Sequence, residues 1–155
     1  MLFRCYSPIG HVYQGGVNKV SIGPGCEILP IVIHELGHSL GFFHEQNRSD
    51  RDDYLDIHWD NMQECKSIVY KPLRTIVNLN VGIQVAFFKH RPGDDRILTP
   101  FDHDSIMLYG ELTGSKDGIS KTLTAKNGHY LKESYMKSGL SPLDIEKVNK
   151  LYGCR

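Results

Sequence analysis

The sequence predicts an α+β domain with short strands, an internal helix and a C-terminal helix. Strand and turn signals alternate over residues 5–28, a helical pattern begins at Pro30, and a second helical pattern lies between Ser141 and Gly153. The chain has 155 residues, of which 40% are hydrophobic and 23% charged, as in an ordinary globular protein. It has no internal repeat or linker, so we expect one domain over residues 1–155.

The first of these segments is expected to be extended. Cys5–Gly10 has strand character, and Gly15-Gly16 and Gly23-Pro24-Gly25 signal turns. Between the turns we expect a short, half-buried strand whose two faces alternate, with Asn18, Val20 and Ile22 on one face and Lys19 and Ser21 on the other.

The internal helix is expected from about Pro30 to Leu40. Proline suits a first helical position because the N–H that it lacks would be unpaired there. Ile33, Leu36 and Leu40 form an apolar stripe at helical spacing, and Gly41 suits the turn that ends the helix.

The C-terminal helix has start and stop signals. Ser141 is the expected N-cap, with Pro142 at the first helical position and Asp144 in the first turn, and Gly153 follows the last turn. The apolar positions at helical spacing are Ile145, Val148, Leu151 and Tyr152. We therefore expect an amphipathic helix. The region of residues 72–105 carries mostly loop signals.

Composition disfavours two classes of partner. Lys and Arg number 18 and Asp and Glu number 18, so no net positive charge attracts nucleic acid. The longest apolar stretch, Ile28–Ile33, has six residues, whereas a spanning helix needs roughly 20, so no membrane insertion is expected. Only four residues precede Cys5, and we expect that any export signal was removed or never included. The sequence does not indicate an oligomeric state.

The candidate metal-binding and catalytic side chains are concentrated in residues 34–44. His34 and His38 are four residues apart, so a helix places both imidazoles on one face, and His44 follows after the break at Gly41. Three ligands leave one position of a tetrahedral zinc ion open for a water whose pKa falls to near 7. Glu35 is placed to take the proton of that water. The histidine pair alone could be a surface coincidence, but the third histidine at this spacing argues against it.

These residues belong to a longer pattern. His34–Asp52, reading HELGHSLGFFHEQNRSDRD, resembles the signature of the astacin family of zinc metalloendopeptidases, within the metzincin clan. Ser105–Tyr109, reading SIMLY, resembles the Met-turn of the family, and the resemblance extends from Cys5 to the Tyr-Gly-Cys near the end.

The resemblance implies a zinc-dependent endopeptidase that hydrolyses peptide bonds in protein or peptide substrates outside the cell. Zn²⁺ would be bound by His34, His38 and His44, with Tyr109 as an additional ligand in the resting state. Glu35 would be the general base, Tyr109 would then hydrogen-bond the oxyanion, and Met107 would form an apolar floor beneath the metal. In the family the residue that matches Glu45 contacts the mature N-terminus, to which this chain's own start does not correspond.

The resemblance also implies an architecture. The fold would be a metzincin catalytic domain whose cleft has the active-site helix as its floor. Residues 1–44 would be the remnant of an upper subdomain with a partly missing sheet, and residues 45–155 the lower subdomain, so the chain would be N-terminally truncated. Cys5–Gly10 matches the edge strand against which the family lays its substrate, although Pro8 cannot donate a backbone hydrogen bond. Leu108 replaces a histidine common in the Met-turn and should affect packing only.

Four cysteines allow three pairings that the sequence alone cannot rank. The resemblance implies a Cys5–Cys26 disulfide and leaves Cys154 without its family partner. Cys65 is then a free thiol or a substitute partner for Cys154.

The mixed charges of residues 48–53 are expected to form ion pairs that fix the turn after His44, and the five histidines outside the motif are interpreted as ordinary groups. The alternative to an enzyme is a catalytically inactive, zinc-binding interaction module or fragment.

Overall fold

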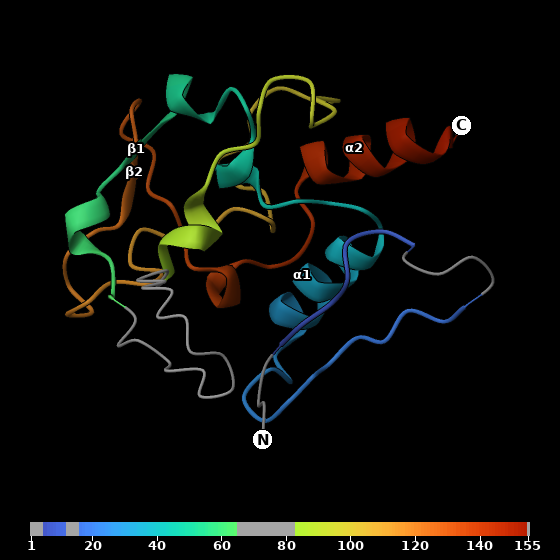
Figure 1. The fold of residues 1–155 in the computed structure, drawn as a ribbon. Helices are drawn as coiled ribbons and strands as arrows, with labels where there is room; N and C mark the ends of the chain where they lie inside the picture. Colours follow the sequence, from blue (N-terminus) through green and yellow to red (C-terminus); the bar gives the residue numbers. More distant parts are fainter. Residues whose placement is uncertain (1–4, 12–15, 65–82, 155) are drawn as a thin grey trace, which may run out of the picture.

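The fold combines two helices with a small antiparallel sheet (Figure 1). The computed structural model describes residues 5–11, 16–64 and 83–154. Within these ranges, α1 spans Leu29–Ser39, α2 spans Pro142–Tyr152, β1 spans Leu55–Ile57 and β2 spans Leu123–Ala125. The strands pair antiparallel, with Leu55 opposite Ala125 and Ile57 opposite Leu123. The α+β prediction is confirmed.

The strand predicted over Asn18–Ile22 does not form. The segment contributes one bridge, in which Tyr6 and Ser21 exchange backbone hydrogen bonds of 3.0 and 2.7 Å. Val20 is only partly buried and Ile22 is exposed, so the segment has no apolar face whose burial would extend the pairing. The prediction of a half-buried strand was wrong for this reason.

Helix α1 begins and ends close to the predicted residues, but of its predicted apolar stripe only Ile33 packs against the core. Proline lies in its first turn, and Gly41 follows with a φ of 100°, a conformation that L side chains rarely adopt. Leu36 and Leu40 are exposed, whereas the buried residues of the helix are His34, Glu35, Gly37 and His38. The side of α1 that faces the protein is therefore mainly polar.

Gly37 lets α1 approach the Met-turn closely. A Cβ at this position would lie 2.7 Å from the sulfur of Met107, which is fully buried. Phe42, Ile106 and Met107 form a small apolar cluster against which Ile33, Val148 and Leu151 pack. This cluster joins α1, the Met-turn and α2.

A larger core lies around the sheet. It consists of Leu55, Met62, Phe87, Phe101, Leu108, Leu123, Ala125 and Leu131. Leu108 is fully buried in it, as expected for a residue that affects packing. The segment that carries the Met-turn thus contributes side chains to both apolar clusters.

Helix α2 has the predicted caps. The Ser141 side chain accepts a hydrogen bond from the Asp144 backbone N–H, the Asp144 side chain accepts one from the Ser141 backbone, and Gly153 ends the helix with a φ of 66°. Val148 and Leu151 contact the core, whereas Ile145 and Tyr152 are exposed. The predicted caps are confirmed, and so are two of the four predicted apolar contacts, those of Val148 and Leu151.

The ion pairs expected after His44 are present. The Arg48 guanidinium contacts Glu45 at 2.7 Å and Asp50 at 2.8 Å, and Arg51 contacts Asp52 at 2.8 Å. Arg48 and Arg51 are both buried, so they fix the backbone through further hydrogen bonds to carbonyl groups.

The disulfide that the resemblance implied is formed. Cys5 and Cys26 are bonded, with their Cα atoms 5.6 Å apart, and this bond ties the segment before α1 to the segment of residues 5–10. Cys154 is an exposed free thiol. Cys65 lies outside the described residues.

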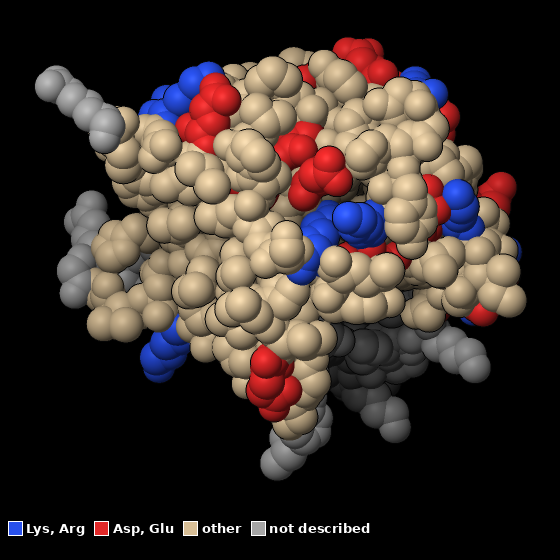
Figure 2. All heavy atoms as spheres, turned by 180° about the vertical axis from the view of Figure 1, so that it is seen from behind, with Lys and Arg blue, Asp and Glu red and all other residues tan. Residues whose placement is uncertain are grey.

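The surface carries both signs of charge. Figure 2 shows acidic and basic side chains interspersed on one face, with broad uncharged areas between them. In the ranges that the structure describes, no helix is both long and apolar enough to cross a membrane.

The contribution of the sheet to the stability of the core can be measured by substitution. Leu123→Ala removes a fully buried side chain and should lower the free energy of unfolding by about 2–5 kcal/mol, as large-to-small core substitutions do. Ile119→Ala, at an 81% exposed position, should change it by less than about 0.5 kcal/mol. Urea unfolding of the two variants measures both values, and equal effects would contradict the described core.

Candidate metal centre

Three imidazoles converge at the C-terminal half of α1. His34 and His38 lie one helical turn apart, and the reversal at Gly41 returns the chain so that His44 meets them. The Nε2 atom of His44 lies 3.1 Å from that of His34 and 3.2 Å from that of His38. In the part of the chain that the structure describes, this is the group of histidine, cysteine or acidic side chains that could hold a metal ion.

The hydrogen bonds of Nδ1 in His34 and His38 show that Nε2 is the nitrogen of each ring that can bind a metal ion. The Nδ1 atom of His34 lies 2.8 Å from the Ile106 carbonyl oxygen, and that of His38 lies 2.8 Å from the Phe42 carbonyl oxygen. A carbonyl oxygen only accepts, so we assign the proton of each neutral ring to Nδ1 and a bare lone pair to Nε2. Each carbonyl therefore orients a ring toward the shared centre.

Bare lone pairs that face one another repel unless a cation lies between them. Two nitrogens at 2.0–2.1 Å from a tetrahedral ion lie about 3.3 Å apart. The distances of 3.1 and 3.2 Å between the Nε2 atoms match this geometry within a few tenths of an ångström. The donor set, three neutral imidazoles, fits a divalent transition metal such as zinc.

Burial keeps the three rings uncharged. It lowers the pKa of His34 from 6.5 to about 4, and repulsion from His38 and Lys137 adds to this effect. It also lowers the pKa of His38, and it lowers that of His44 well below the usual value. Neutral imidazole is the form that binds a metal ion, so the site is prepared for metal at neutral pH.

Glu35 and Tyr109 line the same cavity of about 570 Å³ as the three histidines. Glu35 is buried, and burial raises its carboxyl pKa. Burial, with repulsion from Glu35, raises the pKa of Tyr109 to about 12, so its hydroxyl stays protonated at neutral pH. The Tyr109 ring centre lies 4.5 Å from that of His44.

The other residues expected near the site have structural positions. Met107 lies beneath α1 against Gly37, and Gly41 makes the reversal that brings in His44. Cys5 lines the cavity, whereas its disulfide partner Cys26 does not.

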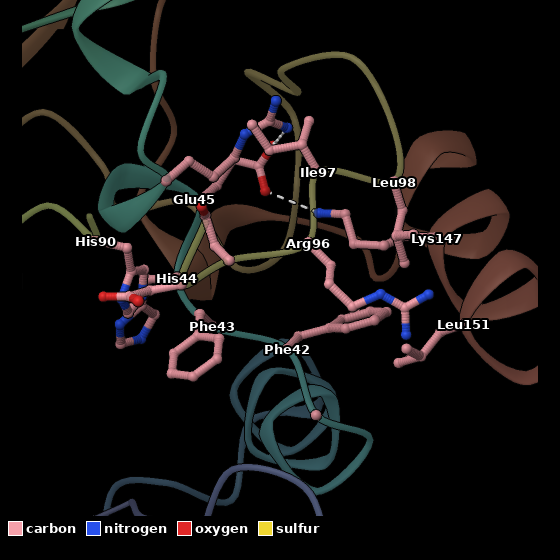
Figure 3. A pocket seen from close by; sticks show the side chains of 14 residues that line it. Phe42, Phe43, His44, Glu45, His90, Arg96, Ile97, Leu98, Lys147 and Leu151 are labelled. Carbon is pink, nitrogen blue, oxygen red and sulfur yellow. Dashed lines mark hydrogen bonds and ion pairs between the residues drawn. The ribbon is translucent and has the colours of Figure 1, made fainter. Parts of the chain in front are cut away.

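Glu45 is held by two cations on the far side of the His44 segment. One of its carboxylate oxygens accepts from Arg48 at 2.7 Å and the other from Lys147 of α2 at 2.8 Å. Both Glu45 and Lys147 line a second cavity, of about 240 Å³, and Figure 3 shows the ion pair between them. The carboxylate is buried, so these contacts compensate its charge and fix the segment that carries His44.

The structure adds residues to which the sequence analysis assigned no role at the site. The side-chain amide nitrogen of Asn47 donates to the carbonyls of Ala86 and Phe88, and its backbone N–H donates to the His44 carbonyl at 3.1 Å, so Asn47 fixes the backbone of the third histidine. His90, interpreted from the sequence as an ordinary group, lines both cavities and packs its ring 4.5 Å from that of Phe43. These residues are distant from the motif or carry no spacing signal, so sequence reasoning had no means of finding them.

Comparison with protein families and curated proteins gives consistent matches. The sequence model of Astacin, a peptidase family, matches residues 3–81 and 75–153. Astacin-like metalloprotease toxin 1 of Loxosceles intermedia is 40% identical over 153 residues, which cover 97% of this chain and 52% of the toxin. Zinc metalloproteinase nas-15 of Caenorhabditis elegans is 38% identical over 151 residues, covering 97% of this chain and 23% of that protein.

A solved structure matches as well. High choriolytic enzyme 1, a hatching enzyme zinc-protease from Oryzias latipes, superimposes with a TM-score of 0.76 at 35% identity. The match covers 98% of this chain and 66% of that one. The chain spans about half the length of the toxins that it matches, and less of other relatives.

The lowered pKa of His34 predicts how stability depends on pH in the metal-free chain. An unfolded histidine takes up its proton near pH 6.5, whereas folded His34 does so near pH 4, so stability is lost as the pH falls between these values. From pH 7 to pH 5, His34 alone should lower the free energy of unfolding by about 2 kcal/mol, although the raised pKa of Glu35 offsets part of this loss.

Urea unfolding at both pH values measures this loss. His34→Asn should show a smaller loss on acidification than the wild-type chain, whereas His11→Asn, at an exposed position, should show the same loss. A loss that is equal in the wild type and His34→Asn would contradict the assignment.

Proposed function

The chain belongs to the astacin family of peptidases, and from this premise we propose that it is a zinc-dependent endopeptidase that hydrolyses peptide bonds in proteins. The observation that carries the proposal is the convergence of three Nε2 atoms within 4.8 Å, in the same cavity as Glu35 and Tyr109.

His34, His38 and His44 would hold the zinc ion. The Nε2 atom of His44 lies 3.1 and 3.2 Å from those of the other two rings, close to the separation of two ligands on a tetrahedral ion, and Nδ1 hydrogen bonds orient His34 and His38 toward it. When bound, zinc supplies Lewis acidity, which makes hydroxide available near neutral pH and polarises the substrate carbonyl.

Glu35 would be the general base. It follows the first ligand on α1 and lies in the wall of the same cavity. Its raised pKa brings the carboxylate closer to the pH at which it works, because a base with a pKa near the operating pH transfers protons most effectively. After taking the proton from water, Glu35 can give it to the departing amine.

Tyr109 would stabilise the oxyanion. A pKa of about 12 keeps its hydroxyl as a hydrogen-bond donor, which is the form that the developing negative charge needs. Its backbone N–H donates to the side-chain oxygen of Gln46 at 3.2 Å, and this bond fixes the residue beside the His44 segment.

Residues 5–10 would bind the substrate backbone. Tyr6 uses its N–H and C=O to pair with Ser21, so the corresponding groups of Ser7 point to the opposite side of the segment. Cys5, Tyr6, Ser7 and Ile9 line the cavity. A peptide could therefore add as an antiparallel strand, with recognition through backbone groups that depends little on its sequence.

The Cys5–Cys26 disulfide supports an extracellular location, because such bonds persist in oxidising compartments. Three of the relatives are named metalloprotease toxins. We therefore place the enzyme and its protein or peptide substrates outside the cell.

Glu35→Ala separates metal binding from catalysis. The variant should keep about one zinc ion per chain, because the three imidazoles remain, and should lose roughly 100- to 10,000-fold in kcat/KM because the base is absent. Metal analysis and cleavage of a denatured protein at pH 7 measure the two properties.

Glu27→Ala, which removes an exposed carboxylate that accepts a hydrogen bond from the nearby Gly25 N–H, is the matched control and should retain activity. Loss of zinc from Glu35→Ala would contradict the assignment of Glu35 as base. A zinc-loaded wild-type chain that cleaves nothing would instead support a zinc-binding interaction module.

A further inference from the structure

Lys137 is a buried lysine with no role in the sequence motif. It follows the short 3₁₀ helix Ser134–Met136, which packs against α1, and it is only 7% exposed. Its ammonium donates to the carbonyl oxygen of Ser105 at 2.6 Å and to that of Leu108 at 2.5 Å. These carbonyls belong to the first and the fourth residue of the Met-turn.

Asp144 holds the same turn by its donor groups. One carboxylate oxygen accepts from the Ser105 hydroxyl at 2.7 Å and the other from the Ile106 N–H at 2.8 Å. Asp144 is completely buried at the start of α2. A cation thus binds the carbonyls of the turn and an anion binds its donors, and the opposite charges of Lys137 and Asp144 attract each other.

The turn transmits this restraint to the metal ligands. The Ile106 carbonyl oxygen lies 2.8 Å from Nδ1 of His34, and the Met107 carbonyl oxygen accepts from the Glu45 N–H at 3.0 Å. The first contact sets the ring of the first ligand. The second fixes the backbone directly after His44.

We propose that Lys137 is a positioning residue of the metal centre, holding the Met-turn so that the Ile106 carbonyl keeps the Nε2 lone pair of His34 aimed at the ion. The inference rests on the proposed zinc site and extends it to a residue about a hundred positions away in the sequence. Outer partners of metal ligands of this kind change metal affinity without touching the ion.

Burying the Lys137 ammonium loses its solvation by water, and its two hydrogen bonds to the Met-turn give a physical reason for a lysine at this position. Burial lowers the pKa of Lys137 to about 8, while the attraction of Asp144 and Asp102 opposes that effect. An apolar side chain would avoid the loss of solvation, but it would leave two buried carbonyls of the turn without this donor.

Zinc affinity tests the proposal with three variants of the full 155-residue chain. Lys137→Met removes the donor and keeps the length of the side chain, Lys137→Arg keeps a cationic donor, and Lys116→Met is the matched control. Lys116 also donates to a backbone carbonyl, that of Asp60 at 2.7 Å, but from an exposed position away from the site.

Competition with a chelator of known affinity should show a zinc Kd about 10- to 100-fold higher for Lys137→Met, and within about threefold of wild type for the other two variants. Urea unfolding of the metal-free chains identifies a purely structural role, which would lower stability while leaving the zinc Kd of the folded chain unchanged. That result would overturn the proposal. If Lys137→Met does not fold, Lys137→Gln replaces it, and a wild-type zinc Kd in that variant would likewise overturn the proposal.

The orientation of His34 can be measured without zinc or activity. In the metal-free wild-type chain, ¹⁵N NMR of the imidazoles should show His34 protonated at Nδ1, and Lys137→Met or Lys137→Gln should mix this tautomer with the other one. An unchanged tautomer and unchanged ring shifts would overturn the proposal. Failure of the wild-type chain to bind zinc would instead overturn the proposed function, so the two outcomes are distinguishable.

Discussion

Three uncharged imidazoles, with their Nε2 atoms 3.1 and 3.2 Å apart, impose the central constraint on this fold, because nitrogens with bare lone pairs stay this close only if something compensates their repulsion. The protein supplies part of that compensation by fixing each ring from outside. The Ile106 carbonyl holds His34, the Phe42 carbonyl holds His38, and the ion-paired segment after His44 holds the third ring.

This constraint explains the unusual burial of side chains on α1. Its buried face carries His34, Glu35 and His38, whereas Leu36 and Leu40 are exposed. The apolar contact that packs the helix comes instead from beneath Gly37, where Met107 approaches closely. The packing of α1 and the orientation of the His34 ring thus depend on the same short turn, which Asp144 and Lys137 hold by hydrogen bonds.

The local features of the fold could be predicted from the sequence because each rests on neighbouring residues. Pro30 and Gly41 bound α1, Ser141 and Gly153 bound α2, and the spacing of the histidines places them together. The strand over Asn18–Ile22 could not be judged in the same way, because alternation does not reveal whether a partner strand and a surface to cover are present. The contacts of Lys137, Lys147 and His90 with the site were equally inaccessible, since they depend on which distant segments meet in the folded chain. The division into subdomains at residues 44 and 45 stays a prediction.

The convergence of the three rings on one metal ion is tested most directly by crystallography of the zinc-loaded chain with X-rays at the zinc absorption edge. The account predicts one anomalous peak at 2.0–2.1 Å from the Nε2 atoms of His34, His38 and His44. A peak elsewhere in the chain, or three rings that share no peak, would contradict it.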